Sequence, residues 1–176
     1  MKRRRFLFLG VAAALAACGP RVPASGPGGM PVFRITSREA DRIPERMRDA
    51  LNSYRAAGGL APVSLDPRLS QAAEAHARDM SRQNRPWLWG SDASSPIDRA
   101  VRAGYTQPFV GEVISESFES DIATLDAWMA TPETRVILMD PSARAMGIGW
   151  LQESGGKIWW SLNLGGGSGS FALADA

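Results

Sequence analysis

The sequence has few residues that cross-link or catalyse: one cysteine, Cys18, and one histidine, His76, among 176 residues. A single cysteine excludes an intramolecular disulfide, so packing must stabilise the fold. A Ser-His-Asp triad would have to use His76, and no Gly-x-Ser-x-Gly elbow precedes a predicted helix. Ser154 and Lys157 have the spacing of a serine acyl-enzyme motif, but they fall in a glycine turn rather than at the start of a helix.

Long hydrophobic runs are also missing. The apolar run over residues 6–17 is broken only by Gly10, and it is shorter than the roughly 20 residues that a membrane-spanning helix needs. It follows Lys2 and three arginines. A basic segment followed by a short apolar segment is typical of a secretory signal peptide, so we interpret residues 1–17 in this way.

Cys18 follows this run directly. The segment Leu15-Ala16-Ala17-Cys18 resembles the lipobox of bacterial lipoproteins, in which the cysteine thiol carries a diacylglycerol. The resemblance predicts attachment to a membrane through Cys18, because two or more acyl chains anchor a protein stably. We expect the domain on the extracytoplasmic side of the cell membrane or outer membrane. Gly19, in place of aspartate, favours the outer membrane by resemblance to Gram-negative sorting rules.

Positive charge is scarce once the predicted signal peptide is set aside. The whole chain has a formal charge of +2, but four of its basic residues occupy positions 2–5. The remainder has 16 basic residues against 18 acidic ones, and nucleic-acid binding requires a clustered basic face. The composition therefore gives no support to a nucleic-acid partner.

The rest of the sequence predicts one α+β domain over residues 36–164, between a flexible tether (18–35) and a flexible tail (165–176). Periodicity and capping residues predict helices over about 36–57, 67–83, 96–104, 121–129 and 132–139. Alternation predicts strands over about 109–117, 146–150 and 158–164. In the first helix, the residues expected to point inward are Ile43, Met47, Leu51 and Tyr54.

Several short segments stand in a characteristic order and spacing. They are Leu51-Asn52-Ser53-Tyr54-Arg55, Leu65-Asp66-Pro67-Arg68-Leu69, Ala75-His76-Ala77-Arg78-Asp79-Met80, Gly90-Ser91-Asp92 with Arg99, Ala103-Gly104-Tyr105, Gly111-Glu112, Thr131-Pro132 with Arg135, and Met146-Gly147-Ile148-Gly149. This series resembles the CAP superfamily (the SCP or PR-1-like domain) in its bacterial form. The resemblance implies an α-β-α sandwich with a small, mainly antiparallel sheet and a central cleft.

Many members of that superfamily line the cleft with two histidines and two acidic residues that can bind a divalent metal, a ligand set of the kind that zinc needs. Glu112 matches one acidic residue, but Leu88 and Thr134 stand where the resemblance places the two histidines. The second acidic residue has no clear counterpart near Ala130 or Thr131. We therefore expect no metal of the family type and no other cofactor.

His76 and Glu112 leave two interpretations open. His76 matches a family histidine outside the cleft pair, and its spacing with Leu69, Ala73 and Met80 fits a core position. Alternatively, His76 pairs with Glu112 at the floor of the cleft as an acid and a base. Glu112 is either a buried structural carboxylate with a partner or a residue that contacts a ligand.

Trp87, Leu88 and Trp89 place large apolar groups where the family often has a histidine. An apolar mouth with few polar groups favours ligand binding. We therefore expect a non-enzymatic, membrane-anchored domain that binds an apolar ligand or an envelope component near these residues, Glu112 and Thr134. One alternative is a hydrolase that uses the histidine–glutamate pair on a peptide or glycan. The other is a purely structural module between membrane and cell wall.

Overall fold

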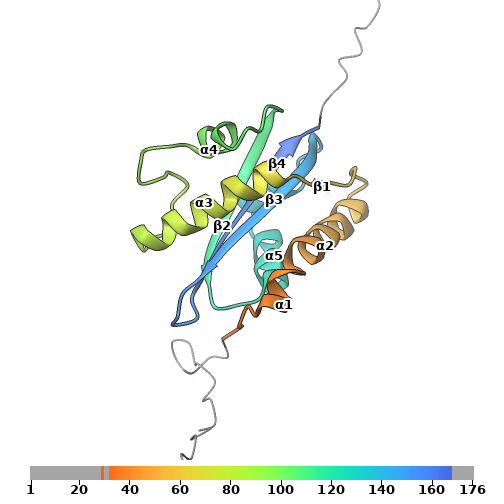
Figure 1. Ribbon diagram of the computed structural model, residues 1–176. Coiled ribbons are helices and arrows are strands. Elements are labelled where there is room, and N and C mark those ends of the chain that lie inside the picture. The colour runs from red at the N-terminus through yellow and green to blue at the C-terminus, as the bar shows by residue number, and fades with distance from the viewer. Residues whose placement is uncertain (1–28, 30–31, 168–176) are drawn as a thin grey trace, which may run out of the picture.

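Residues 29 and 32–167 are described by a computed structural model of the chain (Figure 1). The predicted signal peptide, Cys18, most of the predicted tether and the end of the predicted tail lie outside these residues. Within the described part, no helix is both long enough and apolar enough to cross a membrane.

The chain enters the fold through two consecutive helices, α1 (Ser37–Ala40) and α2 (Ile43–Ala57). The Thr36 side chain accepts a hydrogen bond from the first turn of α1, as its capping role predicts. We expected one continuous helix here. Pro44 has no amide hydrogen for the carbonyl of Ala40, so the helix restarts instead of continuing.

The inward face of α2 differs from the prediction at one position. Ile43, Met47 and Leu51 are fully buried, but Tyr54 is 36% exposed and Arg55 is buried instead. The Arg55 guanidinium donates hydrogen bonds to four main-chain carbonyls, those of Ala61, Leu138, Asp140 and Ala143. These acceptors allow a cation to be buried on a face that otherwise holds apolar side chains.

The next two helices begin at capping residues, and their bounds are close to the predicted ones. α3 (Pro67–Gln83) begins after Asp66, whose carboxylate accepts hydrogen bonds from two amides of the first turn. It ends at Asn84, which adopts a left-handed conformation with φ of 50°. α4 (Pro96–Arg102) begins with a reciprocal capping box that includes Ser95. Proline in the first turn of each helix made both recognisable in the sequence.

The sheet has the strand order β1-β3-β4-β2. The long strands β2 (Phe109–Ser117), β3 (Ala143–Gln152) and β4 (Ile158–Gly166) pair antiparallel. β1 (Ser64–Leu65) pairs parallel with β3, and the sequence did not predict it, because two residues show no alternation. β2 is an edge strand, since no described strand pairs with its outer side.

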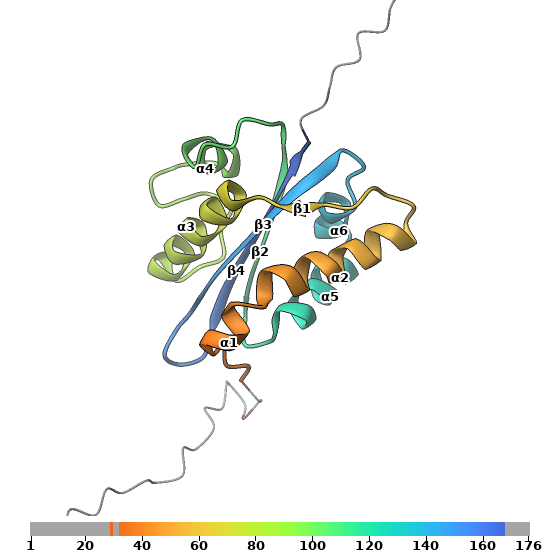
Figure 2. The ribbon, with the colours of Figure 1, turned by 45° about the vertical axis from the view of Figure 1, so that its right-hand side comes forward.

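Helices cover both faces of this sheet (Figures 1 and 2). α3 and α4 lie on one face, whereas α2, α5 (Asp121–Ala130) and α6 (Pro132–Leu138) lie on the other. The main hydrophobic core lies on the α2 side and includes inward side chains of the strands such as Ile148 and Leu162. The predicted α-β-α sandwich with a mainly antiparallel sheet is confirmed.

Two glycines allow α3 to approach the sheet closely. A Cβ at Gly147 would overlap the α3 backbone at residues 69–70, and a Cβ at Gly149 would overlap it at residues 73–74. Only a residue without a side chain fits at either position. The helix therefore packs directly on β3 and β4, which brings His76 against the face of the sheet that carries the Glu112 side chain.

The fold extends past both predicted domain ends. Phe33 and Ile35, which we placed in the tether, pack against the main core. β4 continues through Gly166, which we placed in the tail. The Tyr105 hydroxyl donates to the Gly166 carbonyl at 2.6 Å and holds this last part of the strand. These contacts correct the predicted ends of the tether and of the domain.

Candidate functional site

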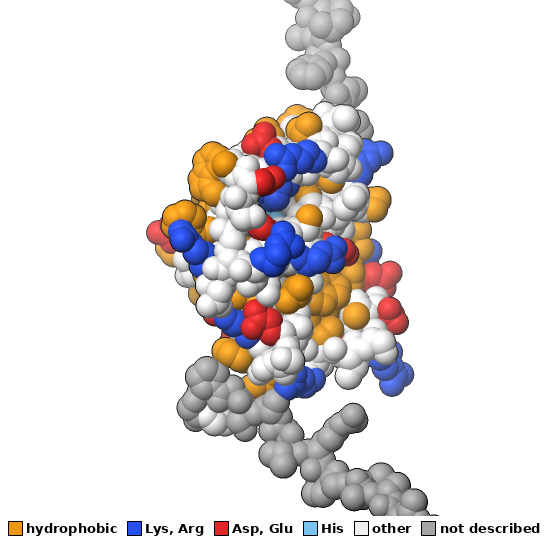
Figure 3. All heavy atoms as spheres, turned by 60° about the vertical axis from the view of Figure 1, so that its left-hand side comes forward, with side chains coloured by type: hydrophobic (Ala, Val, Ile, Leu, Met, Phe, Trp, Pro, Cys, Tyr) orange, Lys and Arg blue, Asp and Glu red, His pale blue; other side chains and the backbone are white. Residues whose placement is uncertain are grey.

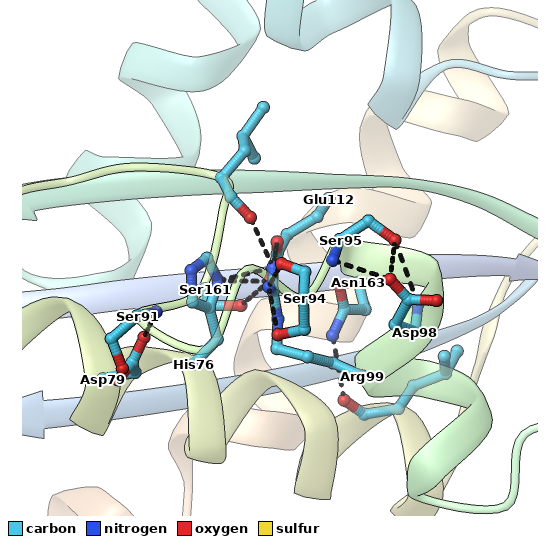
Figure 4. Close-up of polar contacts among 12 residues, drawn as sticks. His76, Asp79, Ser91, Ser94, Ser95, Asp98, Arg99, Glu112, Ser161 and Asn163 are labelled. Atoms are coloured by element: carbon cyan, nitrogen blue, oxygen red, sulfur yellow. Dashed lines mark hydrogen bonds and ion pairs between the residues drawn. The ribbon is translucent and has the colours of Figure 1, made fainter.

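His76 on α3 and Glu112 on β2 face each other between the helix and the sheet (Figure 4). His76 Nδ1 lies 2.8 Å from Glu112 Oε1, and neither side chain has exposed surface. The structure thus brings together the two residues whose relationship the sequence left open.

Two more side chains hold the same carboxylate. Arg99 Nη2 donates to Glu112 Oε2 at 2.6 Å, and the Ser161 hydroxyl donates to Oε1 at 2.6 Å. Arg99 is itself fixed, because it also donates to the carbonyls of Leu88 and Ser94. The buried charge of Glu112 is therefore compensated by a cation and by neutral donors, as buried charges require. We call His76, Arg99, Glu112 and Ser161 the buried cluster.

Arg99 and Ser161 were not among the predicted site residues. Ser161 alternates with the core residues Trp160 and Leu162, so the pattern placed it on the opposite face of β4. The sequence did not reveal the register of β2 against β4, which sets Ile114 opposite Ser161. Without that register, no pattern indicated that Ser161 reaches the glutamate.

The distance between His76 and Glu112 fits an acid–base pair, but the burial of both side chains does not. A general base must approach its substrate within hydrogen-bond reach or through one water. The second ring nitrogen of His76, Nε2, is buried and has no hydrogen-bond partner among the described residues. In this arrangement the two side chains join α3 to β2, and neither has exposed surface that a substrate could contact.

A groove of about 520 Å³ lies along the outer edge of β2, and we call it the edge groove. The segment 86–89, strand β2 and helix α6 line it. Five of the six predicted cleft residues are among those that line it: Trp87, Leu88, Trp89, Glu112 and Thr134. The sixth, His76, lies behind Glu112 in the buried cluster. The groove is within the size range of roughly 300–1,000 Å³ that is usual for ligand sites.

One wall of the edge groove is apolar and exposed. Trp87, Leu88 and Trp89 are 52%, 44% and 57% exposed, although large apolar side chains are usually buried. The Arg85 guanidinium stacks on the Trp87 ring, 3.1 Å from its centroid. The Trp159-Trp160 pair, by comparison, is fully buried. The two tryptophan pairs therefore differ in role, and only the first is available to a ligand.

The floor of the edge groove is main chain rather than carboxylate. Glu112 as a residue is 4% exposed, but its side chain is 0% exposed, so the atoms that reach the groove belong to its backbone. On the α6 side, the Thr134 hydroxyl turns toward the Trp128 carbonyl and donates a hydrogen bond to it. Neither residue presents a free ionisable group to the groove.

These side chains do not fit the family's metal. Leu88 and Thr134 provide no imidazole, and the Glu112 carboxylate is already bound to the permanent cation of Arg99. The described residues contain no group of three or more His, Cys, Asp or Glu that could hold a metal ion. The absence of a bound metal remains a prediction.

Arg99 also borders a polar hollow of about 310 Å³ between α3 and α4. Figure 3 views this side of the molecule and shows acidic and basic side chains gathered next to one another. Burial alone would raise the pKa of the Asp79 carboxyl, but hydrogen bonds from Ser91 and Arg82 outweigh it and hold that pKa below its ordinary value. The acids of this hollow are already paired within the chain.

A family model described as the cysteine-rich secretory protein family (CAP) matches residues 48–164, more than half of the chain. The matched region runs from α2 to β4 and includes the buried cluster and the edge groove. No curated protein sequence matches the chain.

Several solved structures share the fold. An extracellular protein containing an SCP domain from Bacillus anthracis has a TM-score of 0.67 at 18% identity, over 77% of this chain and 45% of that one. An outer surface protein from Borrelia burgdorferi has a TM-score of 0.61 at 16% identity, over 77% of this chain and 99% of that one. A cysteine-rich secretory protein from Staphylococcus aureus has a TM-score of 0.58 at 14% identity, over 71% and 38%. The chain spans less than half of the first and third proteins, and at these identities the likeness concerns the fold.

Proposed function

This chain belongs to the cysteine-rich secretory protein (CAP) family, and from that premise we propose that it is a membrane-anchored, extracytoplasmic binding domain without catalytic activity. Its ligand or envelope partner occupies the edge groove. One contrast carries the proposal: the apolar wall of the groove is exposed, whereas the carboxylate and imidazole beside it are fully buried.

The exposed wall favours binding on energetic grounds. Burial of a large apolar side chain contributes roughly 1.5–3 kcal/mol when it is complete, and Trp87, Leu88 and Trp89 lie next to one another in one groove. A contiguous apolar patch of this kind on a soluble domain is typical of an interaction site. The groove therefore offers binding free energy through its apolar wall.

Tryptophan emission tests this binding. The other tryptophans are buried or half-buried, so a ligand in the groove changes the emission of Trp87 and Trp89 first. The chain from residue 18 onward, with Cys18→Ser to remove the acylation site, is titrated with the apolar dye anilinonaphthalene sulfonate. We expect saturable quenching of this emission and a saturable rise in the emission of the dye itself. The rise in dye emission should be lost in the double variant Trp87→Ala/Trp89→Ala. Equal dye binding by both proteins would place the site elsewhere, and no binding at all would favour the structural module.

A hydrolase is the second candidate, and one observation favours it. The 2.8 Å separation of His76 Nδ1 and Glu112 Oε1 meets the distance that acid–base chemistry requires. The proposal of a binding domain predicts no turnover of dye-labelled casein or peptidoglycan by the purified chain. Turnover that His76→Asn abolishes, with the folded structure retained, would establish the hydrolase instead.

The anchor is proposed from Cys18, which lies outside the described residues. Its support is the resemblance to a lipobox, together with two proteins of similar fold, an extracellular protein from Bacillus anthracis and an outer surface protein from Borrelia burgdorferi. In bacterial cells, an alkyne-labelled fatty acid should be incorporated into the parent chain and not into Cys18→Ser, which should leave the membrane fraction. Ser25→Ala, in the same segment, is the matched control and should remain labelled. Labelling of both variants would exclude Cys18 as the anchor.

A further inference from the structure

The outer edge of β2 has main-chain groups that point away from the sheet. Trp128 Nε1 on α5, a helix outside the sheet, donates to the Ile114 carbonyl at 3.0 Å. This is the contact expected of a carbonyl that points away from β4. In a strand, the amide and carbonyl of one residue share a direction, and so do those of the residue two positions away. The Ile114 amide and both main-chain groups of Glu112 therefore point outward as well.

These three groups open into the edge groove. Glu112 and Ile114 both line it, and Glu112 does so through its backbone alone. Among the described residues, no other element donates to the Glu112 carbonyl or accepts from either amide. Main-chain groups of an edge strand that lack partners are a template for another strand.

The walls of the groove fit an extended chain with alternating side chains. Trp87 and Trp89 form an apolar wall on one side, and Ile137 of α6 lies on the other. Glu133, at the start of α6, is exposed and makes no hydrogen bond or ion pair with the residues that the structure describes. Of the described residues that line the groove, it has the one charged side chain that is exposed. Its charge is complementary to a lysine or arginine of an occupant.

We propose that the occupant of the edge groove is an extended segment of a partner polypeptide, which pairs with β2 as a fifth strand. It makes hydrogen bonds with the Glu112 amide, the Glu112 carbonyl and the Ile114 amide. Its apolar side chains pack against Trp87 and Trp89, and a basic side chain faces Glu133. This inference rests on the proposed binding function and names the class of partner.

The probe is a pair of capped seven-residue peptides in which valine alternates with lysine or with glutamate. Backbone NMR of the chain from residue 18 onward, with Cys18→Ser, reports hydrogen exchange at single amides. We expect the lysine peptide to slow exchange of the Glu112 and Ile114 amides at least tenfold. The Val113 amide, which points toward β4 by the same alternation, should show no such change and is the internal control.

N-methylation of the peptide tests the strand pairing itself. A methyl group on every second peptide nitrogen removes either the hydrogen bonds to β2 or those on the far side. We expect one of the two methylated lysine peptides to lose binding at least tenfold and the other to bind as before. Equal binding by both would overturn the proposal, because an apolar contact alone does not distinguish the two sets of amides.

The charge of Glu133 provides a matched pair of variants. Glu133→Gln should weaken the lysine peptide about threefold or more and reduce its preference over the glutamate peptide. Glu119→Gln changes an exposed glutamate outside the groove and should leave both affinities unchanged. A lysine preference that Glu133→Gln leaves intact would contradict the assigned orientation.

The outcomes separate this inference from the function on which it rests. If neither peptide protects the two amides while the dye still binds in a Trp87- and Trp89-dependent manner, the strand proposal is wrong and the binding function stands. If neither peptides nor dye bind, both are wrong.

Discussion

His76 Nδ1 and Glu112 Oε1 lie 2.8 Å apart in a space that solvent does not reach. Arg99 binds the other carboxylate oxygen and also holds the carbonyl of Leu88, in the apolar wall of the edge groove. The buried cluster thus connects α3, the edge strand and the segment 86–89. In the proposed binding domain its effect would be indirect, because it positions the wall that a ligand would contact.

Loss of the buried carboxylate should destabilise the fold strongly. Glu112→Gln leaves the Arg99 cation buried without its counter-charge, and breaking a buried pair in this way costs about 3–5 kcal/mol. Urea unfolding at pH 7 measures the change in the free energy of unfolding. The control is Glu116→Gln on the same strand, whose partial exposure and pairing with Lys157 predict a loss below about 1 kcal/mol. Similar losses in both variants would contradict the role given to the buried cluster.

The close packing of α3 on β3 makes a second prediction. A Cβ at Gly149 would overlap the backbone of Ala73 and Glu74, so Gly149→Ala should lower the free energy of unfolding by at least about 2 kcal/mol. Gly155→Ala, in the hairpin turn, places its Cβ in open space and should change stability by less than about 0.5 kcal/mol. Thermal unfolding of the two variants decides between a tight and a loose helix–sheet contact, and equal melting temperatures would exclude the tight one.

The pairing of Asp79 predicts a change in acid stability. Burial acts to raise the pKa of this carboxyl, but Ser91 and Arg82 hold it below its ordinary value. The pKa of this carboxyl is therefore lower in the folded state than in the unfolded state, where it is about 4. The ionised carboxylate stabilises the fold at pH values above the unfolded pKa. This contribution is lost as the pH falls through the folded pKa. Ser91→Ala removes a 2.7 Å hydrogen bond to Asp79 and should lower stability at pH 7 by about 1 kcal/mol.

The same variant should move the midpoint of acid unfolding to higher pH, and circular dichroism between pH 7 and pH 2 measures that midpoint. Ser53→Ala removes an exposed hydroxyl that bonds only a main-chain carbonyl of its own helix. It should leave the midpoint unchanged. A midpoint that stays the same in Ser91→Ala would show that Asp79 does not contribute in this way.

The sequence predicted most of the fold because local signals mark most of its elements. Asp66-Pro67 and Ser95-Pro96 start their helices where expected, since caps and prolines act within one turn. The break before α2 was missed, although Pro44 signals it, because the capping residue Thr36 suggested one longer helix. β1 depends on a distant strand for its only partner, and two residues have no periodicity of their own.

The sequence predicted which residues lie at the groove, but not how their side chains are arranged. The resemblance placed Leu88, Glu112 and Thr134 near one cleft, and the structure lines one groove with all three. The Glu112 side chain points away from that groove and toward Arg99. This direction follows from the strand register and from the packing of α3 on two glycines. Both are long-range features that residue spacing does not encode.

The affinity of one dye for two variants tests the central claim, that the edge groove binds through its apolar wall. Leu88→Asp places a charge in that wall, whereas Val136→Asp places the same charge on α6 at an exposed residue outside the groove. In the chain from residue 18 onward with Cys18→Ser, fluorescence titration with anilinonaphthalene sulfonate gives the dissociation constant of each. The account predicts at least tenfold weaker binding for Leu88→Asp, which corresponds to about 1.4 kcal/mol, and an unchanged constant for Val136→Asp. Equal constants for the two variants would contradict it.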